Sequence, residues 1–151
     1  NSRLDSIQAA VLGLKLPHLD GYCHARRQAA RYYNQGFRDN PNILTPLTQK
    51  CGEICDTCNC HVFHQYTLKI TNGRRDAVHK HLLDKGIPNE IYYPVPLHSQ
   101  KAYADERYNE ADFKVTNELS DTVISLPMHT ELDKEQQDLI IKTVIEAVES
   151  N

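Results

Sequence analysis

The stretch HVFHQYTLKI, residues 61–70, constrains the fold more than any other part of the sequence. Apolar and polar residues alternate along it, which is the period of a half-buried β-strand. One face of this strand would carry five side chains, those of Val62, His64, Tyr66, Leu68 and Ile70. A strand with one apolar face needs neighbouring strands and a covering layer. We therefore expect a small sheet with helices packed against it.

Helical periodicity dominates both ends of the chain. The first apolar stripe consists of Leu4, Ile7, Val11 and Leu14, and Pro17 interrupts it. A second helix is expected from Leu19 to Gln35, with Gly36 placed to end it. The final helix would start at the capping pair Asp133 and Gln136. Its inward stripe would consist of Ile141, Val144, Ile145 and Val148.

The middle of the chain alternates between shorter elements. The pattern predicts a short strand at 43–45 and a helix at about 74–85 that Gly86 ends. A strand should begin at 87 and run into a proline-stiffened loop by 98, and an irregular, partly helical segment should follow at 99–112. A helix at 113–121 and a buried strand at 123–127 complete this part of the chain. The fold class is therefore α/β, α+β-like in character, with a small, mostly antiparallel sheet.

Length and charge exclude several classes of function. The 151 residues suit one domain of a globular protein, and the net charge of −3 gives no support for a nucleic-acid partner. No apolar run has the length of a membrane span, so no membrane partner is expected. Five cysteines form an odd and unevenly spread set without an export signal, which indicates a reducing cytoplasm.

A cysteine-rich stretch, CGEICDTCNCHVFH at 51–64, allows three interpretations. Reduced thiols are favoured, a disulfide or redox pair between Cys55 and Cys58 is possible, and a metal site is the third. If residues 61–70 form a strand, His61 and His64 point to opposite faces and could not easily bind one ion together. A zinc-binding interaction or regulatory module therefore depends on four thiols, those of Cys51, Cys55, Cys58 and Cys60.

Four stretches together resemble the DegT/StrS-type nucleotide-sugar aminotransferases, which are pyridoxal-phosphate enzymes of fold type I. They are NSRLDSIQAAVLGLKLPHLD at 1–20, HVFHQYTLKI at 61–70, IYYPVPLHSQKAYA at 91–104 and VISLPMHTELDKEQQDLI at 123–140. They occur in the family's order across nearly all of the chain. The resemblance breaks only at the cysteine-rich loop.

The resemblance implies that the chain is the C-terminal portion of such an enzyme. Residues 1–36 would be a helical linker from a large cofactor-binding domain, and residues 37–151 the small C-terminal α/β domain. The lysine that binds pyridoxal phosphate would precede the chain, so the fragment should hold no catalytic residue and no cofactor, and should be inactive by itself. The parent would be a cytoplasmic homodimer in bacterial polysaccharide or amino-sugar biosynthesis. It would transfer an amino group, typically from glutamate, to a nucleotide-linked keto-sugar.

The family motifs also imply binding residues. Asn1 matches an asparagine that reaches the cofactor phosphate of the neighbouring subunit, and Arg3 would lie on the sugar-nucleotide side of the pocket. Tyr92 and Tyr93 match a pair that is commonly His-Tyr and lines the substrate pocket, and His98 lies on the same segment. A tyrosine at the histidine position could donate a hydrogen bond to a sugar hydroxyl or stack on the ring.

Overall fold

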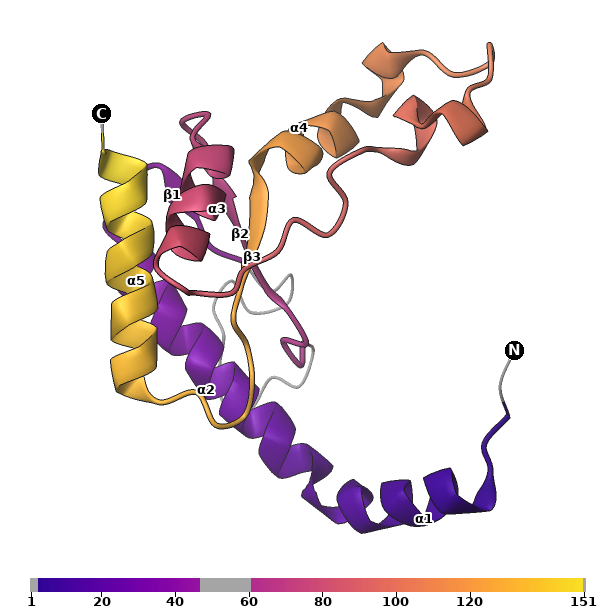
Figure 1. The fold of residues 1–151 in the computed structure, drawn as a ribbon, viewed down its shortest axis with the longest axis vertical. Helices are drawn as coiled ribbons and strands as arrows, with labels where there is room; N and C mark the ends of the chain where they lie inside the picture. Colours follow the sequence, from indigo (N-terminus) through magenta and orange to yellow (C-terminus); the bar gives the residue numbers. More distant parts are fainter. Residues whose placement is uncertain (1–2, 47–60, 151) are drawn as a thin grey trace.

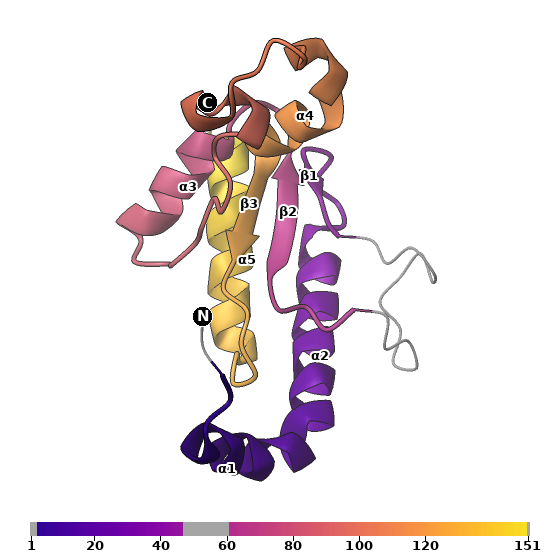
Figure 2. The ribbon, with the colours of Figure 1, turned by 90° about the vertical axis from the view of Figure 1, so that its right-hand side faces the viewer.

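A three-stranded antiparallel sheet lies at the centre of the computed structural model, which describes residues 3–46 and 61–150. Its strands are β1 (Ile43–Leu44), β2 (Tyr66–Ile70) and β3 (Val123–Leu126), in the order β1-β2-β3. The helices are α1 (Ser6–Lys15), α2 (Leu19–Phe37), α3 (Arg75–Asp84), α4 (Lys114–Thr122) and α5 (Lys134–Glu149). Figure 2 shows α5 behind the sheet with α2 beside it. The mixed helical and antiparallel architecture confirms the expected fold class.

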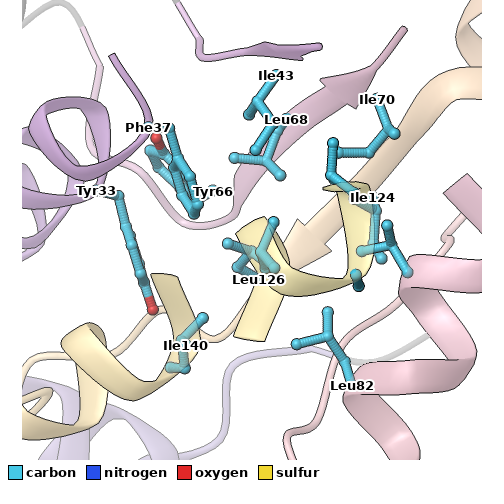
Figure 3. Packing of buried hydrophobic residues seen from close by; sticks show 14 of the residues in the cluster. Tyr33, Phe37, Ile43, Tyr66, Leu68, Ile70, Leu82, Ile124, Leu126 and Ile140 are labelled. Atoms are coloured by element: carbon cyan, nitrogen blue, oxygen red, sulfur yellow. The ribbon is translucent and has the colours of Figure 1, made fainter. Parts of the chain in front are cut away.

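The core forms where α2 and α5 meet the inner face of the sheet (Figure 3). Tyr33 on α2 and Tyr66 on β2 are fully buried, with ring centroids 4.8 Å apart. The Tyr66 hydroxyl donates to Asn34 Oδ1 at 2.7 Å, and the Tyr33 hydroxyl donates to the Pro127 carbonyl at 3.1 Å. Burial raises the pKa of both phenols well above the ordinary value, and the neighbouring Tyr33 adds to the shift at Tyr66. Both hydroxyls therefore remain neutral donors.

The alternation predicted for residues 61–70 is confirmed only in its second half. Tyr66, Leu68 and Ile70 are buried as expected, and Leu68 pairs with Ile124 across β3. The first half is not a strand, because Phe63 takes a left-handed backbone conformation with φ of 50°.

This turn at Phe63 reverses which side chains are buried. The Phe63 ring enters the core, whereas Val62 and His64, which the alternation predicts to be inward, are exposed. Arg26 on α2 stabilises the turn, since its Nη1 donates to the Phe63 carbonyl at 3.3 Å and to the His64 carbonyl at 3.2 Å.

The helix boundaries follow the expected caps, with one exception. Asp133 and Gln136 form a complete capping box at the start of α5, and Gly86 after α3 has φ of 74°, as the sequence predicts. The prediction that Gly36 ends the second helix is wrong, because α2 continues to Phe37. Gly36 instead permits close packing: a Cβ at this position would lie 2.5 Å from Ile141 Cδ1 on α5.

A long segment, residues 91–113, extends from the body as an arm (Figure 1). It contains three 3₁₀ helices, at Leu97–Ser99, Lys101–Tyr103 and Glu110–Phe113, which agrees with the expected irregular and partly helical structure. The strand expected from residue 87 is not present; only Glu90 pairs with β3, through Ser125. Prolines at 88, 94 and 96 explain this, because each removes a backbone donor that a strand would need.

The first helix stands apart from the core. Figure 1 shows α1 at the opposite end of the molecule from the arm. None of its residues is buried, and its predicted apolar stripe is exposed, with Ile7 at 79% and Leu14 at 77%. Among the described residues, no helix has both the length and the hydropathy needed to cross a membrane.

Candidate substrate groove

The predicted site residues fall in different parts of the structure. Asn1 lies outside the described residues. Arg3 is exposed ahead of α1, and Tyr93 is 83% exposed on the arm. Tyr92 is half exposed and lines a groove, which we call the Tyr92 groove.

The Tyr92 groove has a volume of about 280 Å³ and is lined by three segments of the chain. These segments are residues 64–65 before β2, residues 88–90 with Tyr92 at the base of the arm, and residues 125–128 at the end of β3. Its lining contains both polar and apolar side chains. Such a mixture suits a ligand that has both hydroxyl groups and a carbon face.

One wall of the groove is fixed by backbone pairing to the sheet. The Glu90 N–H donates to the Ser125 carbonyl at 3.1 Å, and the Ser125 N–H donates to the Glu90 carbonyl at 2.9 Å. The Ser125 side chain is already paired, with Oγ 2.8 Å from Thr67 Oγ1. The base of the arm, and with it Tyr92, is therefore fastened to the edge of β3.

A second contact fixes the same wall from α3. Asn89 Oδ1 lies 2.6 Å from His79 Nδ1, and Asn89 Nδ2 donates to the Ile87 carbonyl at 3.1 Å. Both polar atoms of the Asn89 side chain thus form hydrogen bonds within this wall and its support on α3. Sequence reasoning missed Asn89 and Glu90, and the only signal available was their place just before the Tyr92–Tyr93 pair.

Arg26 braces two walls of the groove from outside, since its own side chain lines a neighbouring pocket. Besides the carbonyls of residues 63 and 64, its Nη1 donates to the Met128 carbonyl at 3.4 Å. One guanidinium therefore joins the segment before β2 to the segment after β3. These two segments are the groove's remaining walls, so the cavity is formed before any ligand arrives.

His98 belongs to a different pocket. Its ring is stacked on Phe113, with centroids 4.1 Å apart, and its side chain is only 8% exposed. The associated cavity, of about 430 Å³, has aromatic walls from Tyr103 and Tyr108. The structure therefore does not bring His98 together with Tyr92, and it gives His98 a packing role within the arm.

The cysteine hypothesis concerns residues that the structure does not describe. Cys51, Cys55, Cys58 and Cys60 all lie outside the described ranges. Within residues 3–46 and 61–150, no group of three or more histidine, cysteine or acidic side chains could hold a metal ion. The strand argument about His61 and His64 also changes, because neither lies in a strand; His61 Nδ1 instead accepts from the Phe63 N–H at 2.9 Å.

Comparison with known proteins gives these features a context. Residues 1–145 match the DegT/DnrJ/EryC1/StrS aminotransferase family. A solved structure of DesV from S. venezuelae, in complex with a ketimine intermediate, has a TM-score of 0.85 and 36% identity, covering 100% of this chain and 38% of that one.

Two relatives identified by sequence differ in their sugars. The UDP-N-acetyl-3-dehydro-alpha-D-glucosamine 3-aminotransferase of Acidithiobacillus ferrooxidans is 39% identical over 96% of this chain and 36% of its own length. The UDP-2-acetamido-2-deoxy-3-oxo-D-glucuronate aminotransferase of Pseudomonas aeruginosa is 35% identical over 88% of this chain and 33% of its own length. The chain thus spans little more than a third of the relatives that it matches. It belongs to the DegT/DnrJ/EryC1/StrS aminotransferase family, and corresponds to the C-terminal part of its members.

Proposed function

We propose that this chain is the C-terminal part of a pyridoxal-phosphate-dependent aminotransferase that acts on a nucleotide-linked keto-sugar. The match of residues 1–145 to the family carries the proposal, and the sugar-linked names of both relatives support it. Glutamate would be the amino donor. Bacterial polysaccharide or amino-sugar biosynthesis would use the product.

The described residues do not by themselves form a site for pyridoxal phosphate. That cofactor needs a lysine amine and a cradle for its phosphate, and the residue expected to contact the phosphate, Asn1, lies outside the described residues. Two lysines that line surface pockets are already paired, Lys69 with Glu118 at 3.0 Å and Lys80 with Asp84 at 2.5 Å. The cofactor, which supplies the electron sink for amino transfer, would therefore depend on groups that this part of the chain does not provide.

The contribution of this chain would be to bind and orient the sugar. Tyr92 lies at the groove with half of its surface free, so its ring can stack on a sugar face and its hydroxyl can donate to a ring substituent. The fastened base of the arm holds that ring in place. Fixing the reacting ketone in one orientation is worth a substantial part of a rate enhancement.

We also propose that the enzyme is a cytoplasmic homodimer whose residues 1–36 link the two domains. The exposed apolar stripe of α1 supports an interface at that helix. The odd number of cysteines supports a reducing compartment.

A kinetic test separates sugar binding from the amino-donor half of the reaction. In the full-length enzyme, Tyr92→Ala should lower kcat/KM for the keto-sugar at least tenfold, because the ring contact is lost. The rate at which glutamate changes the visible absorbance of the bound cofactor should stay within about twofold. Leu139→Ala, at an exposed position on α5, is the matched control. Equal loss in both half-reactions would contradict a sugar-binding role for Tyr92, and a full-length protein without a cofactor absorbance would contradict the proposed function.

A further inference from the structure

We propose that the Tyr92 groove selects an uncharged sugar ring over a uronate, and that Glu90 is the residue that determines this choice. The inference rests on the proposed function and specifies its substrate class. The two relatives described above include one named for a glucosamine and one named for a glucuronate, so membership of the family leaves the choice open.

Two of the polar side chains that line the groove are already paired within the protein. The side chains of Asn89 and Ser125 are consumed by bonds to His79, Ile87 and Thr67. Among the described residues that line the groove, the polar side chains left to a ligand are those of His64, Gln65, Glu90 and Tyr92.

Glu90 contributes a carboxylate to the lining of the groove. Its backbone is fixed by two hydrogen bonds to Ser125, so the side chain projects from a rigid point. Oε1 accepts from the Ile91 N–H at 3.2 Å, which leaves Oε2 without a hydrogen-bond partner among residues 3–46 and 61–150. An ionised carboxylate is an acceptor only, and sugar hydroxyls are donors that it can satisfy.

The described side chains that line the groove carry a net negative charge. Lysine and arginine are not among the described residues that line the groove, so Glu90 carries its one permanent charge. A uronate would bring a second carboxylate beside Glu90, and no lysine or arginine among the described lining residues would balance the pair. Like charges at close range oppose binding. Arg3, the cation that the family resemblance assigns to the sugar side, is not part of this wall.

Tyr92 completes the composition of a site for a neutral sugar. An aromatic ring at the edge of the groove provides a surface for the carbon face of a pyranose, while Glu90 and Gln65 meet its hydroxyl or acetamido groups. An acidic acceptor, an amide and an aromatic ring match the hydroxyl groups and the carbon face of a neutral ring. Gln65 and Tyr92 can donate a hydrogen bond to the carboxylate of a uronate, but neither side chain offsets its charge beside Glu90.

The test compares two substrates on the full-length enzyme. They are UDP-linked 3-keto-N-acetylglucosamine and the matching 3-keto-glucuronate, and the measured quantity is the ratio of their kcat/KM values. The wild-type enzyme should favour the neutral sugar at least a hundredfold. Glu90→Gln keeps the size of the side chain and both backbone bonds. It should lower kcat/KM for the neutral sugar about tenfold, the effect of losing one charge-assisted hydrogen bond, and raise it for the uronate.

Glu131→Gln removes an exposed carboxylate outside the groove and should leave the ratio unchanged. A wild-type preference for the uronate, or a ratio that Glu90→Gln does not alter, would overturn the assignment of Glu90 while amino transfer itself stands. Failure of the wild-type enzyme to aminate either sugar would instead overturn the proposed function and this inference with it.

Discussion

Gly36 is a position where two helices of the core, α2 and α5, approach each other closely. Ile141 on α5 occupies the space that a side chain on α2 would need, with Cδ1, Cγ2 and Cγ1 at 2.5, 3.0 and 3.1 Å from an ideal Cβ. A glycine within a helix is about 1 kcal/mol less favourable than an alanine, and close packing between the two helices offsets this loss.

Gly36→Ala should therefore destabilise the chain by about 1 kcal/mol. The gain in helix propensity is about 1 kcal/mol, and forcing a methyl group into a packed contact costs roughly 1–3 kcal/mol. The free energy of unfolding from urea titration measures the difference. In an Ile141→Ala background the clash is gone, and the same substitution should stabilise by about 0.5–1 kcal/mol. Stabilisation by Gly36→Ala in the wild-type background would show that Ile141 moves aside freely.

At the scale of elements, one buried arginine connects α3 to the segment that follows the arm. Arg75 Nη1 donates to the Ser120 carbonyl at 2.7 Å and to the Val123 carbonyl at 3.1 Å, and Nε pairs with Asp76 at 2.6 Å. These two carbonyls lie where α4 ends and β3 begins.

Arg75→Met should destabilise the chain by about 2–4 kcal/mol, because two buried or partly buried carbonyls lose their partner. Hydrogen exchange should also accelerate along α4 more than along α5. The comparison variant is Asp76→Asn, which affects a carboxylate that is 85% exposed and should change stability by no more than about 0.5 kcal/mol. Equal effects of the two substitutions would mean that the ion pair, and not the carbonyl contacts, stabilises this junction.

Elements with a local signal were predictable from the sequence. The capping box at Asp133 and Gln136, the left-handed glycine at 86 and the alternation at 66–70 each depend on residues within one turn or one strand of each other. Such signals survive in any surroundings that bury the same face, which is why β2 and the final helix agree with expectation.

The predictions that proved wrong concern features that depend on contacts between distant parts of the chain. The turn at Phe63 is held by Arg26, 37 residues earlier, and nothing in the HVFH pattern indicates it. The candidate site shows the same limit. Tyr92 was found from a motif, but the groove also requires Ser125, whose partnership with Glu90 only the folded chain reveals.

At the scale of the whole molecule, the apolar side chains of α1 and the turn after it remain uncovered. Ile7 and Leu14 are more than three-quarters exposed, and Leu16 and Leu19 continue the surface. Apolar patches of this kind mark a surface that binds protein.

The 151-residue chain should therefore self-associate. Sedimentation velocity should show species larger than a monomer, and the combined change Ile7→Glu and Leu14→Glu should return the chain to a monomer, because charges on the stripe oppose its burial. Leu139→Glu, a similarly exposed single leucine on α5, should leave the association intact. A strictly monomeric wild-type chain at high concentration would contradict this expectation.

The arm and α4 together form a loop, residues 91–122, whose two ends lie at neighbouring positions of one strand. Glu90, just before the arm, pairs with Ser125, and the chain returns through α4 to enter the same strand at Val123. Pairing within the sheet therefore holds both ends of this loop together, whatever residues lie between them. The entropic cost of closing a loop grows only slowly with its length. Residues 91–113 can accordingly differ in length and sequence between homologues while Glu90 and β3 stay in place. Evolution could thereby diversify one rim of the substrate site at little cost to folding.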